Sequence, residues 1–364
     1  MNLDFSPEQK QFREQMRRFL EKSGGLSQAR SILDGKVQNY SAPIWKGLAE
    51  MSVQAIAIPE EYSGIGLGAL ELCVAAEEIG RALAPVPFLS SVCLCTEAIR
   101  LFGSKEQKAK WLPGLASGEV IGTWATAADH PADEASFRFG ALSGTKAPVL
   151  DGMVAHVAMV VMQDATGAPT LFLCDLMQSG VERQPVKTVD PTRPAARLTF
   201  AGAAVERLGD SGAGAWKTLS DRAAVFLAFE QLGSAETALA MACAYAQERA
   251  AFGRKVGSFQ AIKHKLADMY TKIQLARCHC YYGAWAISTD AAEVPLAAAG
   301  ARCSAIDALD FAAQENIQVH GGIGVTWEAN CHLFYRRARL SALVLGPRHA
   351  WQDRLVASLE QKLA

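Results

Sequence analysis

The sequence lacks an excess of charge of either sign. Its 364 residues include 36 lysines and arginines against 37 aspartates and glutamates, so the formal net charge is −1. Such a balance provides no electrostatic attraction to nucleic acid or to an anionic membrane surface. The sequence also lacks an apolar run long enough to cross a bilayer, and its polar start, MNLDFSPEQKQFREQ, has no signal-peptide core. We therefore expect a cytoplasmic protein with no nucleic-acid and no membrane partner.

Paired cysteines are missing as well. The nine cysteines are scattered, and an odd number without a secretion signal indicates free thiols in a reducing compartment. Cys278-His279-Cys280 brings three candidate metal ligands together. They are too close in sequence for one tetrahedral site and fall in a helical pattern, so we expect no metal.

What the sequence does contain is apolar patterning of two kinds. Half of the residues are hydrophobic, and the length exceeds that of one compact domain. Helical spacing precedes and follows a middle region of short apolar runs that Gly, Pro and Asp separate. We expect an N-terminal helical domain over 1–119, a middle β-barrel or β-sandwich domain over 120–212, and a C-terminal four-helix bundle over 213–364.

Capping residues and prolines predict several helix boundaries. Ser6 followed by Pro7 is typical of a helix start, and Ser104 predicts another. Pro113 is expected to end the helix that Ser104 begins.

One stretch joins two predicted helices through glycines: residues 248–270, ERAAFGRKVGSFQAIKHKLADMY. At this turn, Arg249, Phe252 and Gln260 could hold a planar anionic ligand through a cation, a ring and an amide. A helical hairpin with a surface arginine explains the same pattern, so the spacing alone does not decide between the two interpretations.

Further stretches resolve this choice through a resemblance. Four stretches resemble the acyl-CoA dehydrogenase family and occur in the family's order. They are 58–66 (IPEEYSGIG), 103–108 (GSKEQK), 248–270 and 318–328 (QVHGGIGVTWE). His332-Leu333 and Arg336-Arg337-Ala338 follow the last of them. The resemblance covers nearly the whole chain. It implies the helical, β, helical domain order and FAD-dependent removal of two hydrogens from the Cα–Cβ bond of an acyl-CoA thioester. It also implies that electron-transfer flavoprotein accepts the electrons.

The resemblance further implies that FAD is bound largely between subunits of a homodimer, a homotetramer or a heterotetramer with a second family member. The residues that it assigns to the cofactor are Arg249, Phe252, Gln260, Gln318, His320, Gly321, Gly322, Thr326 and Glu328. The glycine pair would let a backbone approach the pyrophosphate or adenosine part, since glycine has no side chain to obstruct it. Without the resemblance, a tight turn between helices would explain the same glycines.

The sequence departs from the family pattern in two places. Residues 124–131 read WATAADHP where the family has a loop like Thr-Glu-Pro-x-Ala-Gly-Ser-Asp, and 146–149 (KAPV) stand near the usual Trp-Ile-Thr/Ser element. The resemblance therefore does not carry flavin-ring contacts over to the middle domain. The two positions at which family members carry the catalytic glutamate correspond to Leu345 and Ala223, and neither is a carboxylate.

Glu230 is the remaining candidate for the catalytic base. It lies about two helical turns beyond Ala223, roughly 10 Å along the axis, on an apolar stripe. Burial would raise its pKa, as suits a general base, although a hydrogen bond to another helix would give it a structural role instead. Asp221 and Arg222 resemble the family's substrate contacts to the acyl-CoA pantetheine, and a solvated helix start is the alternative for them.

Three functions therefore stay open. The chain is an acyl-CoA dehydrogenase with a displaced base, a base-less subunit of a heteromeric acyl-CoA dehydrogenase, or a non-redox binding protein on the same fold. The resemblance implies fatty acid or sterol side-chain oxidation, because some bacterial family members, including ones that act on sterol side chains, pair a base-bearing chain with a base-less chain. Small residues at 223, 224 and 228 would leave room for a bulky or branched acyl chain, although alanine is also the best helix former.

Overall fold

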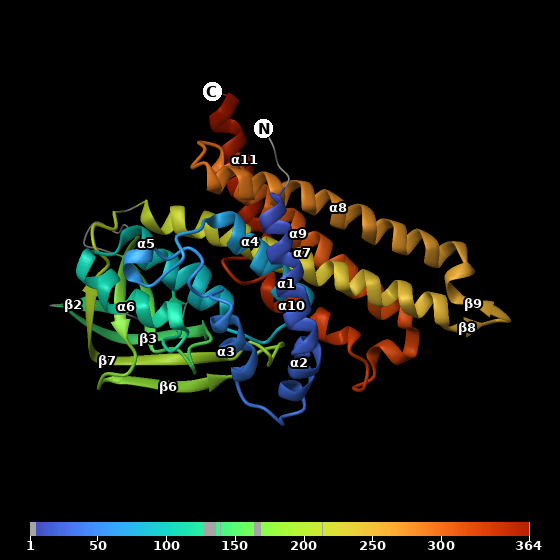
Figure 1. Ribbon diagram of the computed structural model, residues 1–364, viewed down its shortest axis with the longest axis horizontal. Coiled ribbons are helices and arrows are strands. Elements are labelled where there is room, and N and C mark those ends of the chain that lie inside the picture. The colour runs from blue at the N-terminus through green and yellow to red at the C-terminus, as the bar shows by residue number, and fades with distance from the viewer. Residues whose placement is uncertain (1–4, 127–135, 139, 164–168, 213, 364) are drawn as a thin grey trace. The chain divides into compact units, whose positions relative to one another are not determined.

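The computed structural model describes residues 5–126, 136–138, 140–163, 169–212 and 214–363 (Figure 1). The chain forms two compact units, each assembled from segments far apart in the sequence. The helical unit comprises Met1–Ser31, Ala69–Ala84 and Ala224–Ala364, and the sheet unit comprises Ile32–Gly68 and Pro85–Ala223. Within the described ranges, no helix is long and apolar enough to cross a membrane.

The sheet unit is built on a seven-stranded sheet in the order β1-β4-β5-β7-β3-β2, in which β6 also pairs with β7. The strands are β1 (Gly122–Ala125), β2 (Ser136–Arg138), β3 (Ala141–Leu150), β4 (Val157–Gln163), β5 (Pro169–Asp175), β6 (Val181–Val186) and β7 (Ala195–Arg207). All pairs are antiparallel except β1 with β4. β4 is buried on both faces, which explains its continuous apolar sequence VAMVVM. The β-domain expected from the short apolar runs is therefore present.

Helices complete the sheet unit. They are α3 (Ala42–Glu50), the 3₁₀-helix η1 (Glu60–Tyr62), the π-helix η2 (Phe88–Thr96), α5 (Glu97–Phe102), α6 (Lys105–Ser117) and the first residues of α7. All nine residues of η2 are buried, and the Ser91 hydroxyl accepts a hydrogen bond from the Gly122 N–H at 3.0 Å. The predicted cap at Ser104 is confirmed, because its side chain accepts from the Gln107 N–H. The predicted end at Pro113 is wrong, since α6 continues to Ser117.

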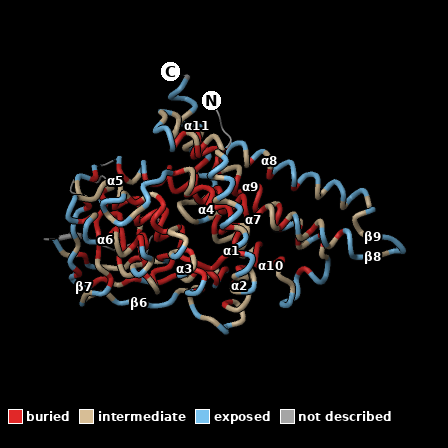
Figure 2. Tube along the Cα trace, viewed as in Figure 1, coloured by how far each residue is buried: buried red, intermediate tan, exposed pale blue. Residues whose placement is uncertain are grey.

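The helical unit contains the long helices of the chain. They are α7 (Ala215–Glu248, from Ala224 on), α8 (Gln260–Ser288) and α9 (Val294–His320), with α1 (Pro7–Lys22), α2 (Gly25–Leu33), α4 (Ala69–Arg81), α10 (Cys331–Ser341) and α11 (Arg348–Leu363). α7 and α8 form a helical hairpin that the short strands β8 (Ala250–Ala251) and β9 (Arg254–Lys255) close. Figure 2 shows this closed end of the hairpin as exposed and the middle of α7 as buried.

α4 and α7 cross at two glycines. A Cβ atom built on Gly233 would lie 1.9 Å from the Glu77 carbonyl oxygen, and one on Gly80 would lie 1.9 Å from the Glu230 carbonyl oxygen. Two hydroxyls on α7 also donate to α4 carbonyls: Ser234 to Gly80 O and Thr237 to Arg81 O, both at 2.8 Å. Only a residue without a side chain permits backbones this close.

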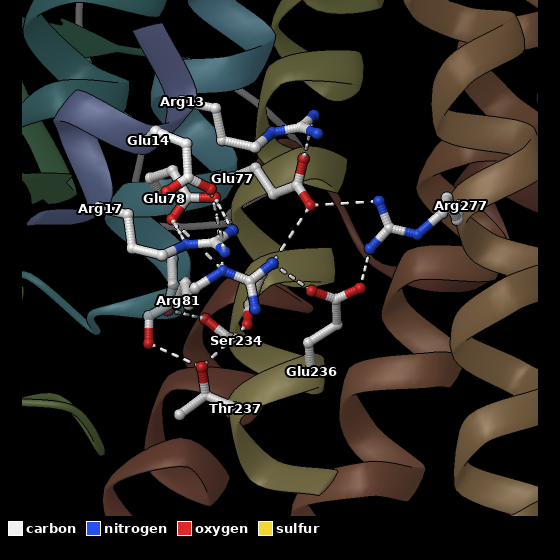
Figure 3. A network of polar contacts seen from close by, with 12 residues as sticks. Arg13, Glu14, Arg17, Glu77, Glu78, Arg81, Ser234, Glu236, Thr237 and Arg277 are labelled. Atoms are coloured by element: carbon white, nitrogen blue, oxygen red, sulfur yellow. Dashed lines mark hydrogen bonds and ion pairs between the residues drawn. The ribbon is translucent and has the colours of Figure 1, made fainter. Parts of the chain in front are cut away.

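Beside this crossing lies a charged network of four arginines and, with Glu14 at its edge, four glutamates (Figure 3). The buried Glu77 carboxylate accepts from Arg13 of α1 at 3.1 Å, Arg277 of α8 at 3.2 Å and Arg81 at 3.4 Å. Arg81 and Arg277 also pair with Glu236 of α7. The network, which Arg17 and Glu78 extend, thereby joins α1, α4, α7 and α8.

Candidate cofactor and substrate site

The tip of the α7–α8 hairpin carries two of the predicted cofactor residues. Arg249 follows directly after α7 and is exposed, and its carbonyl oxygen accepts from the Val256 N–H at 2.8 Å. Phe252 and Gly253 connect β8 to β9 with positive φ angles of 54° and 80°. The Phe252 side chain is 95 % exposed, which is unusual for so large an apolar group. The tip therefore presents a cation and a ring outward.

Behind the tip, side chains of α8 and the preceding turn support one another. The Arg254 guanidinium lies 4.0 Å from the centre of the Phe259 ring, and Phe259 meets Phe252 edge-on at 6.3 Å. Gln260 begins α8 and is exposed, with its amide nitrogen 2.9 Å from Nε2 of His264. The structure thus brings Arg249, Phe252 and Gln260 to one end of the hairpin, as their spacing predicts.

The second predicted motif begins where α9 ends. Gly321 has a φ of 61°, and the 3₁₀-helix η4 (Gly321–Val325) follows. A Cβ atom built on either Gly321 or Gly322 would meet no described atom within 4 Å. Packing against the described residues therefore gives no reason for a glycine at position 322. Its missing side chain leaves room for something outside the chain.

The other predicted residues of this motif lie at the surface. Gln318 and Glu328 are exposed, and the Thr326 hydroxyl donates to the Ile323 carbonyl oxygen at 2.9 Å. Large apolar side chains of the same turn are exposed too: Ile323, Val325 and Trp327. An exposed apolar group of this kind is typical of a surface that a ligand or a second chain covers.

His320 is held from two sides. Its ring stacks on Tyr245 of α7, with centroids 4.2 Å apart and planes 27° from parallel. Its Nδ1 lies 2.7 Å from the Asn316 carbonyl oxygen, which can only accept, so Nδ1 carries a proton. Sequence reasoning missed Tyr245. Its position one helical turn before Arg249, on the same face of α7, was the available signal.

These residues fit a flavin nucleotide. Arg249 supplies a cation for phosphate, Phe252 a ring, and Gly322 an unobstructed backbone. One turn before His320, the fully buried Asn316 amide forms no side-chain hydrogen bond to any described residue. Buried polar groups are nearly always hydrogen-bonded, so this amide has hydrogen-bonding capacity that the described residues leave unused and that a bridging water would take up.

Glu230, the predicted base, lies buried in the helical unit and is ion-paired. Its Oε1 is 3.1 Å from Nη1 of Arg337 on α10, which is also buried. The neighbouring Gln231 accepts from the Arg302 guanidinium at 2.5 Å, and Arg302 donates further to the Ser341 carbonyl oxygen at 2.5 Å. Burial lowers the pKa of Arg302 to about 9. The Glu230 carboxylate is therefore ion-paired with α10, whereas the sequence pattern placed it among apolar side chains.

The two family positions of the base carry apolar side chains in ordered backbone. Ala223 is fully buried on α7. Leu345 is half-buried with a φ of 63°, and its carbonyl oxygen accepts from Nε1 of Trp351 at 2.9 Å. Neither position can accept a proton from a substrate.

The predicted substrate residues Asp221 and Arg222 lie in the sheet unit and are buried. Nε and Nη2 of Arg222 are each 3.1 Å from Oε2 of Glu97, which also pairs with Arg100. Burial acts to raise the pKa of Glu97, but the hydrogen bonds and charges of Arg100 and Arg222 outweigh it and lower that pKa. The alternative of a solvated helix start is therefore wrong.

The part of the sheet unit that departs from the family pattern is only partly described. Trp124 and Ala125 are buried in β1, while 127–131 of the predicted flavin loop lie outside the described residues. In β3, Lys146 is buried, with Nζ 3.4 Å from the Val161 carbonyl oxygen. For metals, the described residues contain no group of three or more His, Cys, Asp or Glu placed to hold an ion.

Comparison with known proteins settles the family. Residues 6–119 match the N-terminal domain of acyl-CoA dehydrogenases, and residues 210–357 match their C-terminal domain. Acyl-CoA dehydrogenase IpdE2 of Mycobacterium tuberculosis (strain ATCC 25618 / H37Rv) is 34 % identical over 344 residues, which are 93 % of this chain and 93 % of that protein. The chain belongs to the acyl-CoA dehydrogenase family.

Two solved structures are similar to nearly the whole chain. A variant of the steroid ACAD Tcur3481–Tcur3483 has a TM-score of 0.89 and 29 % identity, covering 98 % of each chain. The ChsE4–ChsE5 complex from Mycobacterium tuberculosis has a TM-score of 0.90 and 26 % identity, covering 99 % of each chain.

Membership confirms several predictions. The fold is the helical, β, helical arrangement of an acyl-CoA dehydrogenase, and the protein is an FAD-dependent oxidoreductase of acyl-CoA dehydrogenase type. The domain boundaries and the individual site residues stay predictions.

Proposed function

We propose that this chain works as one subunit of an acyl-CoA dehydrogenase whose proton-accepting carboxylate comes from a second, related subunit. The observation that carries the proposal is the state of Glu230 together with the two family positions. Ala223 and Leu345 have no acidic group, and the Glu230 carboxylate is engaged by the buried Arg337 guanidinium at 3.1 Å. To accept a proton from a thioester, Glu230 would have to leave or share a buried ion pair, and breaking such a pair is costly.

The residues of this chain then bind and orient the cofactor, and they do not abstract the proton from the substrate. Arg249 balances cofactor phosphate charge, Phe252 covers a ring of the cofactor, and the amide of Gln260 meets a polar edge. Gly321 and Gly322 allow the backbone of η4 to approach the cofactor closely. When bound, FAD supplies the hydride-accepting chemistry that no side chain can provide.

The partner and the substrate follow from the same reasoning. Two similar structures are named as pairs of proteins, Tcur3481–Tcur3483 and the ChsE4–ChsE5 complex. The first pair is described as a steroid ACAD. This supports a heterotetramer with a second family member and a bulky acyl-CoA substrate, in keeping with small residues at 223, 224 and 228. We expect electron-transfer flavoprotein to accept the electrons, and the nine free cysteines support a reducing cytoplasm.

The test is the visible absorption spectrum of the chain, alone and mixed with related subunits, before and after steroid acyl-CoA thioesters are added. We expect a flavin band that bleaches only in the mixture, and that bleaches equally with Glu230→Gln. Bleaching by the chain alone, abolished by Glu230→Gln, would make Glu230 the base and overturn the proposal.

Matched controls make the outcome specific. Glu360→Gln changes an exposed glutamate of α11 and should leave the spectra unchanged in every mixture. Straight-chain thioesters test the substrate class, since a bulky-substrate enzyme should bleach with them more slowly. A protein that binds no FAD in any mixture would instead support a binding protein without a redox role.

A further inference from the structure

The Tyr245–His320 stack lies between the two cofactor motifs. Tyr245 is one helical turn before Arg249, and the Arg249 N–H donates to the Tyr245 carbonyl oxygen at 2.9 Å. His320 directly precedes the glycine pair. Both rings are half-buried, so the stack belongs to the margin of the bundle rather than to its core. We propose that Tyr245 is a positioning residue for FAD, acting through the His320 ring. The proposal rests on the proposed function and on a contact of His320 with the cofactor, which the resemblance to the family implies.

The contacts leave the His320 ring little freedom. The centroid distance of 4.2 Å and the small angle between planes fix the ring face, and the Nδ1 contact to Asn316 O at 2.7 Å fixes its rotation. With the proton on Nδ1, the neutral ring has Nε2 as its acceptor, and no described residue hydrogen-bonds to that atom. Nε2 accepts from a hydroxyl when the ring is neutral and donates to a phosphate when it is protonated. FAD carries both groups in its adenosine-pyrophosphate half.

A ring that is already oriented loses less freedom when it binds a ligand. Without its stacking partner, the His320 ring would keep, among the contacts to described residues, the hydrogen bond to Asn316 O, and it could turn away. An aromatic pair contributes enough that its loss should weaken FAD binding about two- to tenfold. The stacking contact is made by the ring of Tyr245 and not by its phenol oxygen, so Phe at this position should preserve the effect.

The experiment compares Tyr245→Leu, Tyr245→Phe, His320→Leu and the double variant Tyr245→Leu/His320→Leu. FAD is removed from the assembled protein, and its dissociation constant is then measured from the change in flavin fluorescence on rebinding. We expect Tyr245→Leu to weaken binding by the stated factor and Tyr245→Phe to bind as the unchanged protein does. The double variant should bind no more weakly than His320→Leu alone, because Tyr245 acts through His320.

A role in packing alone predicts different results. The melting temperature of the FAD-free protein would then fall in Tyr245→Leu, and the two single effects on FAD affinity would add in the double variant. Either additive effects or an unchanged affinity in Tyr245→Leu, while His320→Leu is weakened, overturns the role of Tyr245 and leaves the proposed function intact. An unchanged affinity in His320→Leu overturns the contact of His320 with FAD itself.

Discussion

At the scale of single residues, buried charge is organised around Glu77. Three guanidinium groups share its carboxylate, and each arginine is itself partly exposed. Removing one partner of a buried pair leaves the others uncompensated, which is the costly way to disrupt it. An exposed ion pair such as Arg17 with Glu14, 3.9 Å apart, contributes little.

Glu77→Gln should therefore destabilise the protein, by about 2–3 kcal/mol after allowance for the exposure of the arginines. The measurement is the free energy of unfolding in urea. Glu14→Gln is the matched control on α1 and should change that free energy by less than about 0.5 kcal/mol. Equal effects of the two substitutions would contradict the importance of the Glu77 site.

His156 gives the sheet unit a dependence on pH. Burial, aided by the charge of Arg183, lowers the pKa of His156 below its ordinary value of 6.5. Nδ1 accepts the Ile121 N–H at 3.0 Å, which requires that nitrogen to be unprotonated. Below pH 6.5 the unfolded chain therefore binds a proton that the folded chain does not, down to the folded pKa.

Stability should thus fall as the pH drops through this window, by at most about 1.4 kcal/mol per pH unit for one proton. His156→Gln should flatten the slope of unfolding free energy against pH between 7.5 and 5.5. The exposed His349→Gln should leave the slope as it is. A slope that His156→Gln does not change would show that another group causes it.

The sequence predicted the placement of some residues of the candidate site and not of others. Arg249 and Phe252 were predictable because their spacing around a turn brings them to one place whatever the rest of the fold does. The pairing of Glu230 with Arg337 was not, because it joins residues 107 apart in sequence. An apolar stripe shows that a glutamate is buried, and only the packed structure shows which cation it meets.

At the scale of elements, the crossing of α4 and α7 depends on glycine. The backbones meet at Gly80 and Gly233, and the hydroxyls of Ser234 and Thr237 extend the contact.

Elements with clear local signals were predicted well, such as the capped start of α6. The continuation of α6 beyond Pro113 was not predicted. Proline removes one backbone hydrogen bond of the helix, but the burial of Trp111, Leu112 and Leu115 keeps this stretch helical.

Gly233→Ala should force the two helices apart, because its Cβ atom would lie 1.9 Å from the Glu77 carbonyl oxygen. We expect a loss of about 1–3 kcal/mol in the free energy of unfolding, measured in urea. Gly322→Ala is the informative control. Its Cβ atom meets no described atom within 4 Å, so stability should hold while FAD binding weakens. Loss of stability in both variants would contradict the distinction between packing and ligand glycines.

At the scale of the whole molecule, the order of the domains could be predicted from the sequence. The joining of distant segments into compact units could not. Periodicity gave the helical, β, helical order because each element carries its own repeat. It could not show that α1 and α4 join the C-terminal helices in one compact unit. That arrangement rests on contacts such as Arg277 with Glu77, which are 200 residues apart.

The exposed hairpin tip leads to the last prediction. The Phe252 ring is 95 % exposed, and Phe259 is its described packing partner. Covering so large an apolar surface with another molecule is favourable. If FAD and a second chain cover Phe252 together, the flavin should be found only in an oligomer. Light scattering after size exclusion should therefore place the flavin absorbance in a species well above the 39.0 kDa of one chain.

Phe252→Ser should lower the flavin content of that species and shift mass toward the single chain, without a change in the melting temperature of the FAD-free chain. Met177→Ser, which changes an exposed apolar residue of the sheet unit, should alter neither quantity. A single chain that retains FAD would contradict the argument, since the tip would then have no reason to be apolar and uncovered. Loss of flavin with the oligomer intact would assign Phe252 to the cofactor alone and leave the exposed residues of η4 to hold the subunits together.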